Sequence, residues 1–214
     1  MDPNTLINGL LYYLGLVILL TFHEYGHAWM AMKCGDDTAK DEGRLSLNPL
    51  VHLDPIGTGL IPLLQIFSPA LSSFLIGWAK PVPVNLNNLR HPKRDDILIS
   101  MAGPAMNVLL AIGLLGLARI MDLAGQESAL EVCIKMAHLS LLLCFFNLLP
   151  IPPLDGSHVM RVIIGMDYVT YLQIAQYGFI VIILILNFVP IVGGVISLVT
   201  SGTLLLIGRL FGLG

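Results

Sequence analysis

Long runs of apolar residues, separated by short polar segments, dominate the pattern of this chain. The longest runs cover residues 6–32, 97–121, 132–149, 168–189 and 192–210. A helix needs about 20 mainly apolar residues to cross a bilayer, and backbone polar groups inside lipid must be satisfied within the helix. The pattern therefore predicts an all-α polytopic membrane protein with about five transmembrane helices.

The apolar stretch from Asp54 to Trp78 differs from the others because prolines and glycines interrupt it. Proline removes a backbone donor and interior glycine weakens a helix, so this stretch predicts a re-entrant or kinked segment. Two neighbouring pieces, Gly43–Pro49 and Gly77–Asn85, read as short extended, β-like segments.

Composition agrees with a membrane protein, since 56% of the residues are hydrophobic, only 12% are charged and the mean hydropathy is +0.82. The lipid bilayer is thus an expected partner. A net charge of −3 without any basic stripe argues against nucleic acid as a partner. The cysteines Cys34, Cys133 and Cys144 form no C-x-x-C pair. We therefore expect them to pack as small apolar side chains, and we expect neither disulfides nor a thiolate metal site.

The first apolar run ends in the pattern H-E-x-x-H, formed by His23, Glu24 and His27. On a helix, residues four apart lie on one face, so both imidazoles can bind one metal ion. In the chemistry that this spacing serves, the glutamate accepts a proton from a water that the metal activates. A His in an apolar helix is often a satisfied core residue, but three ionisable groups in five positions of a membrane segment indicate a functional site.

A catalytic zinc usually takes three protein ligands, so the two histidines need a third. Asp155 is the preferred candidate because it follows a proline-terminated helix and precedes Gly156, which permits a close backbone approach. The alternative for Asp155 is an ordinary helix-capping residue. His52 and His158 are lesser candidates, and His52 also fits a structural loop role.

Shared ligation constrains the topology, because Asp155 must reach the membrane face where His23 and His27 lie. A re-entrant Asp54–Trp78 segment satisfies this requirement, whereas a full crossing places Asp155 on the opposite face. The positive-inside rule agrees with an outside N-terminus and cytoplasmic loops at 36–44 and 86–94. The basic residues that this topology places on the cytoplasmic side are Lys33, Lys40, Arg44, Lys80, Arg90, Lys93, Arg94, Arg161 and Arg209.

Asn147 stands near the predicted end of the third spanning helix, where we expect it to be buried. A buried amide needs hydrogen-bond partners. It fits either a group that orients a substrate carbonyl or a helix–helix hydrogen bond. Asn107 near Gly103 is better explained by close helix packing.

Together, H-E-x-x-H, the central Ala102–Asn107 segment and the N-x-x-P-x-x-x-L-D-G pattern of Asn147–Gly156 resemble the site-2 protease family of intramembrane zinc metalloproteases. Gly43–Pro49 and Gly77–Asn85 resemble its compact branch, which lacks a PDZ or nucleotide-sensing domain. The resemblance implies peptide-bond hydrolysis inside the membrane by a single zinc ion on His23, His27 and Asp155. It also implies that Glu24 is the general base and that Asn147 orients the substrate.

The expected protein is a single intramembrane metalloprotease domain over residues 1–214, with a core at 6–156 and a C-terminal helical hairpin at 168–211. It is expected to be multi-pass, in the cell membrane of a prokaryote, and to cut a membrane-protein substrate near the cytoplasmic face. Regulation is expected from a separate protein. The alternative is a non-hydrolytic membrane protein that binds or transports a metal, although a carrier has no special need for Glu24 beside His23.

Overall fold

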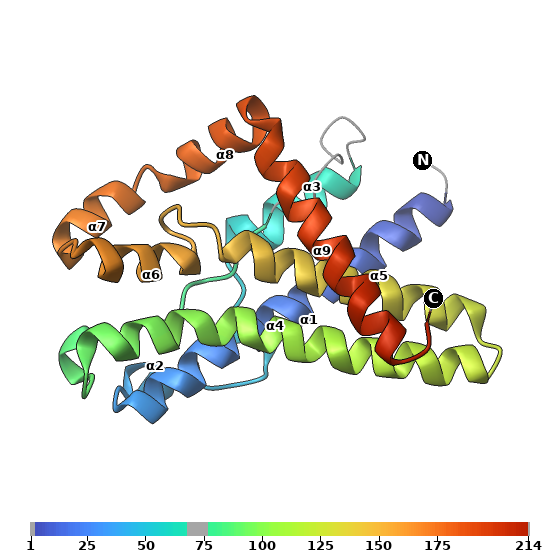
Figure 1. The fold of residues 1–214 in the computed structure, drawn as a ribbon, viewed down its shortest axis with the longest axis horizontal. Coiled ribbons are helices and arrows are strands. Elements are labelled where there is room, and N and C mark those ends of the chain that lie inside the picture. The colour runs from blue at the N-terminus through green and yellow to red at the C-terminus, as the bar shows by residue number, and fades with distance from the viewer. Residues whose placement is uncertain (1–2, 68–76, 214) are drawn as a thin grey trace. The chain divides into compact units, whose positions relative to one another are not determined.

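The computed structural model describes residues 3–67 and 77–213 and divides the chain into two compact units, Met1–Arg90 and His91–Gly214. Both units are helical, and no strand is formed within the described ranges. Figure 1 shows the first unit in blue to cyan and the second in green to red. Each unit is described by itself.

The first unit is built on one long apolar helix, α1 (Pro3–Cys34). Lys33 lies in its last turn, where a cation interacts favourably with the helix dipole. The helix ends at Gly35, whose φ of 105° is a conformation that glycine adopts readily. The shorter elements of this unit are α2 (Thr38–Asp41), η1 (Pro49–Val51), η2 (Pro55–Leu60), α3 (Ile61–Phe67) and η4 (Leu86–Asn88).

The predicted re-entrant segment contains no long helix in its described part. It begins with the π-type turn η2 and the seven-residue α3, and residues 68–76 lie outside the described residues. Its two ends meet, because the Trp78 N–H donates to the Gly57 carbonyl over 3.2 Å. A Cβ on Gly57 would lie 2.4 Å from the Trp78 indole, so only glycine allows this approach. A re-entrant hairpin over this segment stays a prediction.

The second unit is organised around the antiparallel pair α4 (Pro92–Leu123) and α5 (Glu127–Asn147). Its buried apolar core consists of Ala111, Leu115, Ala137, Leu141 and Ile207. Alanines at the contact let the helix backbones approach closely, as is common between membrane helices. The Ser140 hydroxyl donates to the Asn107 carbonyl over 2.7 Å, which joins the two helices near the fully buried Asn107.

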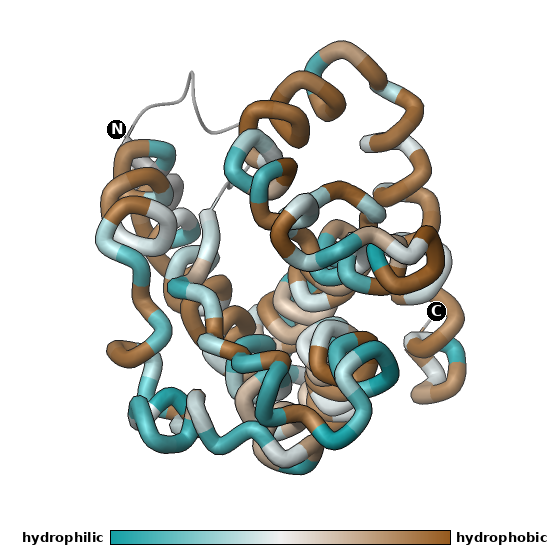
Figure 2. Tube along the Cα trace, turned by 90° about the vertical axis from the view of Figure 1, so that its left-hand side faces the viewer, coloured by the Kyte–Doolittle hydropathy of each residue, from teal (hydrophilic) through white to brown (hydrophobic). Residues whose placement is uncertain are grey.

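Four shorter or later helices complete the second unit: α6 (Asp155–Ile164), α7 (Tyr168–Ala175), α8 (Gly178–Phe188) and α9 (Pro190–Leu210). Gly178 permits close chain approach, since a Cβ there would lie 1.8 Å from the Pro152 carbonyl oxygen. Pro190 occupies the start of α9, where its missing N–H leaves no helical bond unmade. Figure 2 shows hydrophobic residues, in brown, along most helical turns, and hydrophilic residues, in teal, mainly in connecting segments.

The structure supports the predicted multi-pass architecture. Within the described residues, four helices, α1, α4, α5 and α9, are long and apolar enough to cross a membrane. The pair α7 and α8 meets the same criteria together, with a 57° bend between them, and can count as a fifth span. The predicted span at 168–189 is thus formed by two helices and not by one.

The predicted β-like segment at Gly43–Pro49 is not confirmed, because residues 43–48 contain a turn and bends and no strand. Local hydrogen bonds compete with strand pairing here. The Ser46 hydroxyl accepts from the Asn48 N–H over 3.1 Å, and Asn48 in turn accepts from the Leu50 N–H over 3.1 Å. Residues 77–85 carry no assigned strand either, so the predicted β-like pieces are not confirmed.

The re-entrant interpretation predicts that Asp37 and Asn87 lie on the same membrane face. Single Asp37→Cys and Asn87→Cys variants, with Cys34, Cys133 and Cys144 replaced, should react with an impermeant thiol reagent from one side of sealed membranes. A Gln126→Cys control in the loop after α4 should react from the other side, because α4 is long enough to span. Labelling of Asp37→Cys and Asn87→Cys from opposite sides would contradict the hairpin.

Candidate metal centre

The H-E-x-x-H motif lies in the last third of α1, where helical geometry places its two histidines on one face. The Nε2 atoms of His23 and His27 lie 3.0 Å apart. Their rings meet edge to face, with centroids separated by 4.7 Å. Both side chains are buried, at 4% and 8% exposure. The structure thus brings these two predicted ligands together as the spacing requires.

This pair of nitrogens fits a metal ion. Two imidazole nitrogens bound to one tetrahedral zinc at about 2.0–2.1 Å lie roughly 3.3 Å from each other. The observed separation of 3.0 Å is close to that value. Convergent imidazole nitrogens in an apolar, buried setting are a suitable donor set for zinc.

Glu24 is buried beside the two histidines, and its carboxylate has a defined partner. Its Oε2 accepts a hydrogen bond from the Val82 N–H over 3.2 Å. This contact orients the carboxylate with a backbone donor from residues 77–85, a segment far from α1 in sequence. Orientation by a fixed donor is what a general base needs before it can accept a proton.

Residues 77–85 are held in place by further backbone contacts. The Lys80 N–H donates to the His52 carbonyl over 2.9 Å. The buried Arg44 donates from Nη2 to the Lys80 carbonyl over 2.5 Å. His52 is itself buried, and its Nε2 contacts the Ser46 carbonyl at 2.8 Å. His52 therefore acts as a structural loop residue, one of the two roles considered for it.

Asp36 anchors the far end of the same segment. Its Oδ2 accepts from the Asn85 N–H over 2.8 Å, and its Oδ1 accepts from the Asn88 side chain over 2.9 Å and from Thr38. Burial raises the pKa of Asp36, but these hydrogen bonds outweigh it and hold the pKa below its ordinary value. The ionised carboxylate thus ties the loop after residues 77–85 to the end of α1.

In the second unit, Asp155 is the first residue of α6 and is partly buried. The helix cap is Leu154, and no side-chain hydrogen bond caps α6, so the alternative of a capping Asp155 receives no support. Gly156 lies directly against the end of α5, since a Cβ would lie 2.1 Å from the Leu148 carbonyl oxygen. The expected close approach at Gly156 is therefore present.

Asn147 is the last residue of α5 and is only partly buried, whereas the sequence predicted burial. Its side-chain amide donates to the Leu143 carbonyl of its own helix over 2.9 Å. The hydrogen bond is thus intrahelical, and the predicted helix–helix bond is not the one formed. A role of Asn147 toward substrate stays a prediction.

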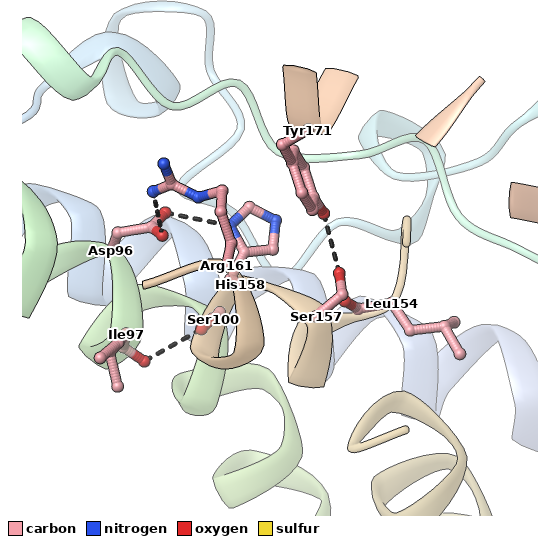
Figure 3. A network of polar contacts seen from close by, with 8 residues as sticks. All are labelled: Asp96, Ile97, Ser100, Leu154, Ser157, His158, Arg161 and Tyr171. Carbon is pink, nitrogen blue, oxygen red and sulfur yellow. Dashed lines mark hydrogen bonds and ion pairs between the residues drawn. The ribbon is translucent and has the colours of Figure 1, made fainter. Parts of the chain in front are cut away.

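A polar network beside α6 was missed by the sequence analysis (Figure 3). Asp96 of α4 contacts two side chains of α6, His158 and Arg161. Ser157, also on α6, shares a hydrogen bond of 3.0 Å with the Tyr171 hydroxyl. The sequence shows ionisable residues next to apolar helices at Asp96 and Arg161, but nothing in it pairs them. His158 is therefore engaged with Asp96.

An apolar helix that is long enough to span a membrane and carries H-E-x-x-H with converging imidazoles is typical of an integral membrane metallopeptidase. Comparisons with known proteins give the family. The profile described as Peptidase family M50 matches residues 120–189. The chain belongs to this family, the site-2 protease family of zinc metalloproteases.

The relatives support this assignment over most of the chain. YwhC of Bacillus subtilis, described as a candidate zinc metalloprotease, is 39% identical over 178 residues, which cover 79% of this chain and 77% of YwhC. Rip2 of Mycolicibacterium smegmatis, with the same description, is 32% identical over 80% of this chain and 64% of Rip2. The zinc metalloprotease MJ0392 of Methanocaldococcus jannaschii is 25% identical over 77% of this chain and 38% of that protein. A comparison with solved structures finds no match.

The anchoring role of Asp36 predicts an acid-dependent loss of stability. The pKa of Asp36 is lower in the folded protein than in the unfolded chain, where it is about 3.9. The ionised carboxylate therefore stabilises the fold at pH values above about 3.9, and this stabilisation is lost as the pH falls through the folded-state pKa. Asp36→Asn should destabilise the protein by about 1–3 kcal/mol at neutral pH. Thermal unfolding in detergent, followed from pH 7 to pH 3, should show the two proteins converging below about pH 4.

Asp37→Asn is the matched control for this measurement. Asp37 is exposed and pairs only at the surface with Lys40, so its replacement should change stability little. An unfolding temperature of Asp36→Asn that stays below that of the wild type by the same amount at every pH would contradict the anchoring role.

Proposed function

We propose that this protein is a zinc-dependent intramembrane endopeptidase that cuts membrane-embedded substrates near the cytoplasmic face. The observation that carries this proposal is the His23 and His27 pair, with nitrogens 3.0 Å apart and Glu24 beside them in a membrane-spanning helix. Membership of a peptidase family fits hydrolysis. The alternative, a metal carrier, is not favoured because the relatives are described as metalloproteases.

His23, His27 and Asp155 are the proposed ligands of a single zinc ion. A catalytic zinc takes three protein ligands, and two imidazoles with one carboxylate form a known ligand set. Asp155 suits the third position because it begins α6 without capping it. When bound, the zinc supplies Lewis-acid chemistry, which polarises the scissile carbonyl and makes water more acidic.

Glu24 is the proposed general base. A carboxylate next to the first histidine can take the proton of the attacking water and later pass it to the leaving amine. The hydrogen bond from the Val82 N–H holds one carboxylate oxygen, so the group is oriented before substrate arrives. Residues 77–85 would then serve the active site directly, through the position of Glu24.

The same segment is a candidate surface for the substrate backbone. A transmembrane helix satisfies its own amides, so it must unwind locally before water can reach a peptide bond. An unwound stretch needs new hydrogen-bond partners, and backbone pairing supplies them. Because Pro81 and Pro83 have no N–H, a substrate along this segment would mainly donate to carbonyl groups. Asn147 is proposed as a further group that orients the substrate.

The proposed location is the cell membrane of a prokaryote, in line with the bacterial relatives. The Asp54–Trp78 segment is proposed to be re-entrant, as the hydrogen bond between its ends supports. The chain is proposed to act as a single metalloprotease domain over residues 1–214. A separate protein is proposed as regulator.

The ligand assignment predicts that Asp155→Ala lowers bound zinc well below one ion per chain in purified protein, because removal of a ligand opens the site to loss of metal. Zinc is measured by elemental analysis after dialysis against a weak chelator. Asp122→Ala is the control, since Asp122 is an exposed partner of Arg119. Full zinc retention by Asp155→Ala would remove Asp155 from the site.

The base assignment predicts that Glu24→Gln keeps the fold and the zinc but loses activity by about 10²–10⁴-fold. The amide oxygen can still accept from the Val82 N–H, yet it cannot take up a proton. Cleavage of a membrane-protein substrate in liposomes measures the effect, with the exposed Glu42→Gln as a matched control. Cleavage by Glu24→Gln at the wild-type rate would exclude Glu24 as the base.

A further inference from the structure

The helix that carries Asp155 is short and is fixed by polar side chains on several sides. α6 has ten residues, and His158 and Arg161 follow Asp155 at helical intervals of three. Each residue of an α-helix advances about 1.5 Å along the axis, so a contact that fixes the helix at His158 lies within one turn of Asp155. The structure therefore concentrates its fixing contacts close to this carboxylate.

Asp96 on α4 makes the main polar contacts that hold α6 in place (Figure 3). Its side chain is only 4% exposed. One oxygen accepts from Arg161 Nη2 over 2.7 Å, and the other contacts His158 Nδ1 at 3.0 Å. The Arg161 guanidinium also lies over the rings of Tyr168 and Tyr171, at 5.4 and 5.9 Å. One carboxylate thus binds two successive turns of α6.

Contacts on other sides of α6 restrict its rotation and its sliding. The fully buried Ser157 donates to the Leu154 carbonyl over 2.5 Å and shares a hydrogen bond with Tyr171. Gly156 lies against the Leu148 carbonyl, so the start of α6 cannot move toward α5 without a clash. With Asp96 on one side and Tyr171 on another, α6 is held in one orientation.

A buried ionic group is an inefficient way to gain stability alone, because desolvation offsets much of the attraction. Its directional hydrogen bonds, however, select one rotation and one register of the helix. Apolar packing between α4 and α6 would hold them together without fixing the rotation of α6 as strictly. A metal ligand needs such a fixed orientation, because functional groups must be held within about 0.5 Å of their productive geometry.

We propose that Asp96 is a positioning residue that fixes α6 through His158 and Arg161 and thereby sets Asp155 for metal binding. This inference rests on the proposed zinc site. It assigns to Asp96 a function in metal affinity, in addition to the helix contact that the structure shows. Groups that orient a metal ligand from outside typically change metal affinity by about 10–100-fold when they are replaced.

The test is the zinc affinity of the folded, full-length protein, measured by competition with a chromophoric chelator in detergent. Asp96→Asn should bind zinc about 10–100-fold more weakly than the wild type. Asp95→Asn is a matched control, because Asp95 is equally buried on the same helix but accepts from the His91 backbone N–H and forms no hydrogen bond or ion pair with a described residue of α6. It should bind zinc with unchanged affinity, even if it unfolds at a lower temperature.

A second variant covers the case in which Asp96→Asn does not fold, because that change leaves Arg161 as a buried unpaired cation. Asp96→Asn combined with Arg161→Met removes both charges. It should fold and still bind zinc more weakly. Circular dichroism confirms the fold of each variant before zinc affinity is measured.

Wild-type zinc affinity in folded Asp96→Asn, or in the double variant, would overturn the inference. So would an equal loss of affinity in Asp95→Asn, because that result would indicate a general effect of destabilising α4. Asp155→Ala, measured in parallel, separates this failure from failure of the zinc site. If Asp155→Ala binds zinc as the wild type does, the ligand set itself is wrong and the inference falls with it.

Discussion

The constraint on which the proposed site depends is the ligation of one metal ion by side chains far apart in the sequence. Two imidazoles from one turn of α1 converge to 3.0 Å between nitrogens and would supply two of the three proposed protein ligands. The proposed third ligand, Asp155, would have to reach the same membrane face, which is the reason for proposing a re-entrant Asp54–Trp78 segment. The hydrogen bond from the Trp78 N–H to the Gly57 carbonyl supports that proposal.

Polar groups in an apolar protein need partners, and the chain provides them by pairing side chains with backbone. The side chains of Glu24, Arg44 and Asp36 contact main-chain N–H or carbonyl groups of residues 77–85. The His52 side chain contacts the Ser46 carbonyl, and the His52 carbonyl accepts from the Lys80 N–H. Each contact satisfies a group that would otherwise be costly to bury. The same contacts fix an irregular segment beside Glu24, the proposed general base. The contacts that satisfy buried polar groups are thus also the ones that would hold the proposed site in place.

Much of the fold could be predicted because its signals are local. Apolar runs predicted the spanning helices, the i, i+4 spacing predicted the histidine pair, and Gly156 predicted a close backbone contact. The errors have physical causes as well. Hydrogen bonds of Ser46 and Asn48 to nearby backbone replaced the expected strand, and Asn147 bonded its own helix. The Asp96 network was not predictable, since it joins residues more than 60 positions apart that carry no motif.

X-ray absorption at the zinc edge of the purified protein can identify the atoms that bind the metal. We expect about two imidazole nitrogens at roughly 2.0–2.1 Å together with oxygen ligands in the first coordination sphere. His27→Ala should remove one imidazole contribution from the spectrum. Sulfur scattering at about 2.3 Å, or a sphere of oxygen atoms without imidazole, would contradict the account.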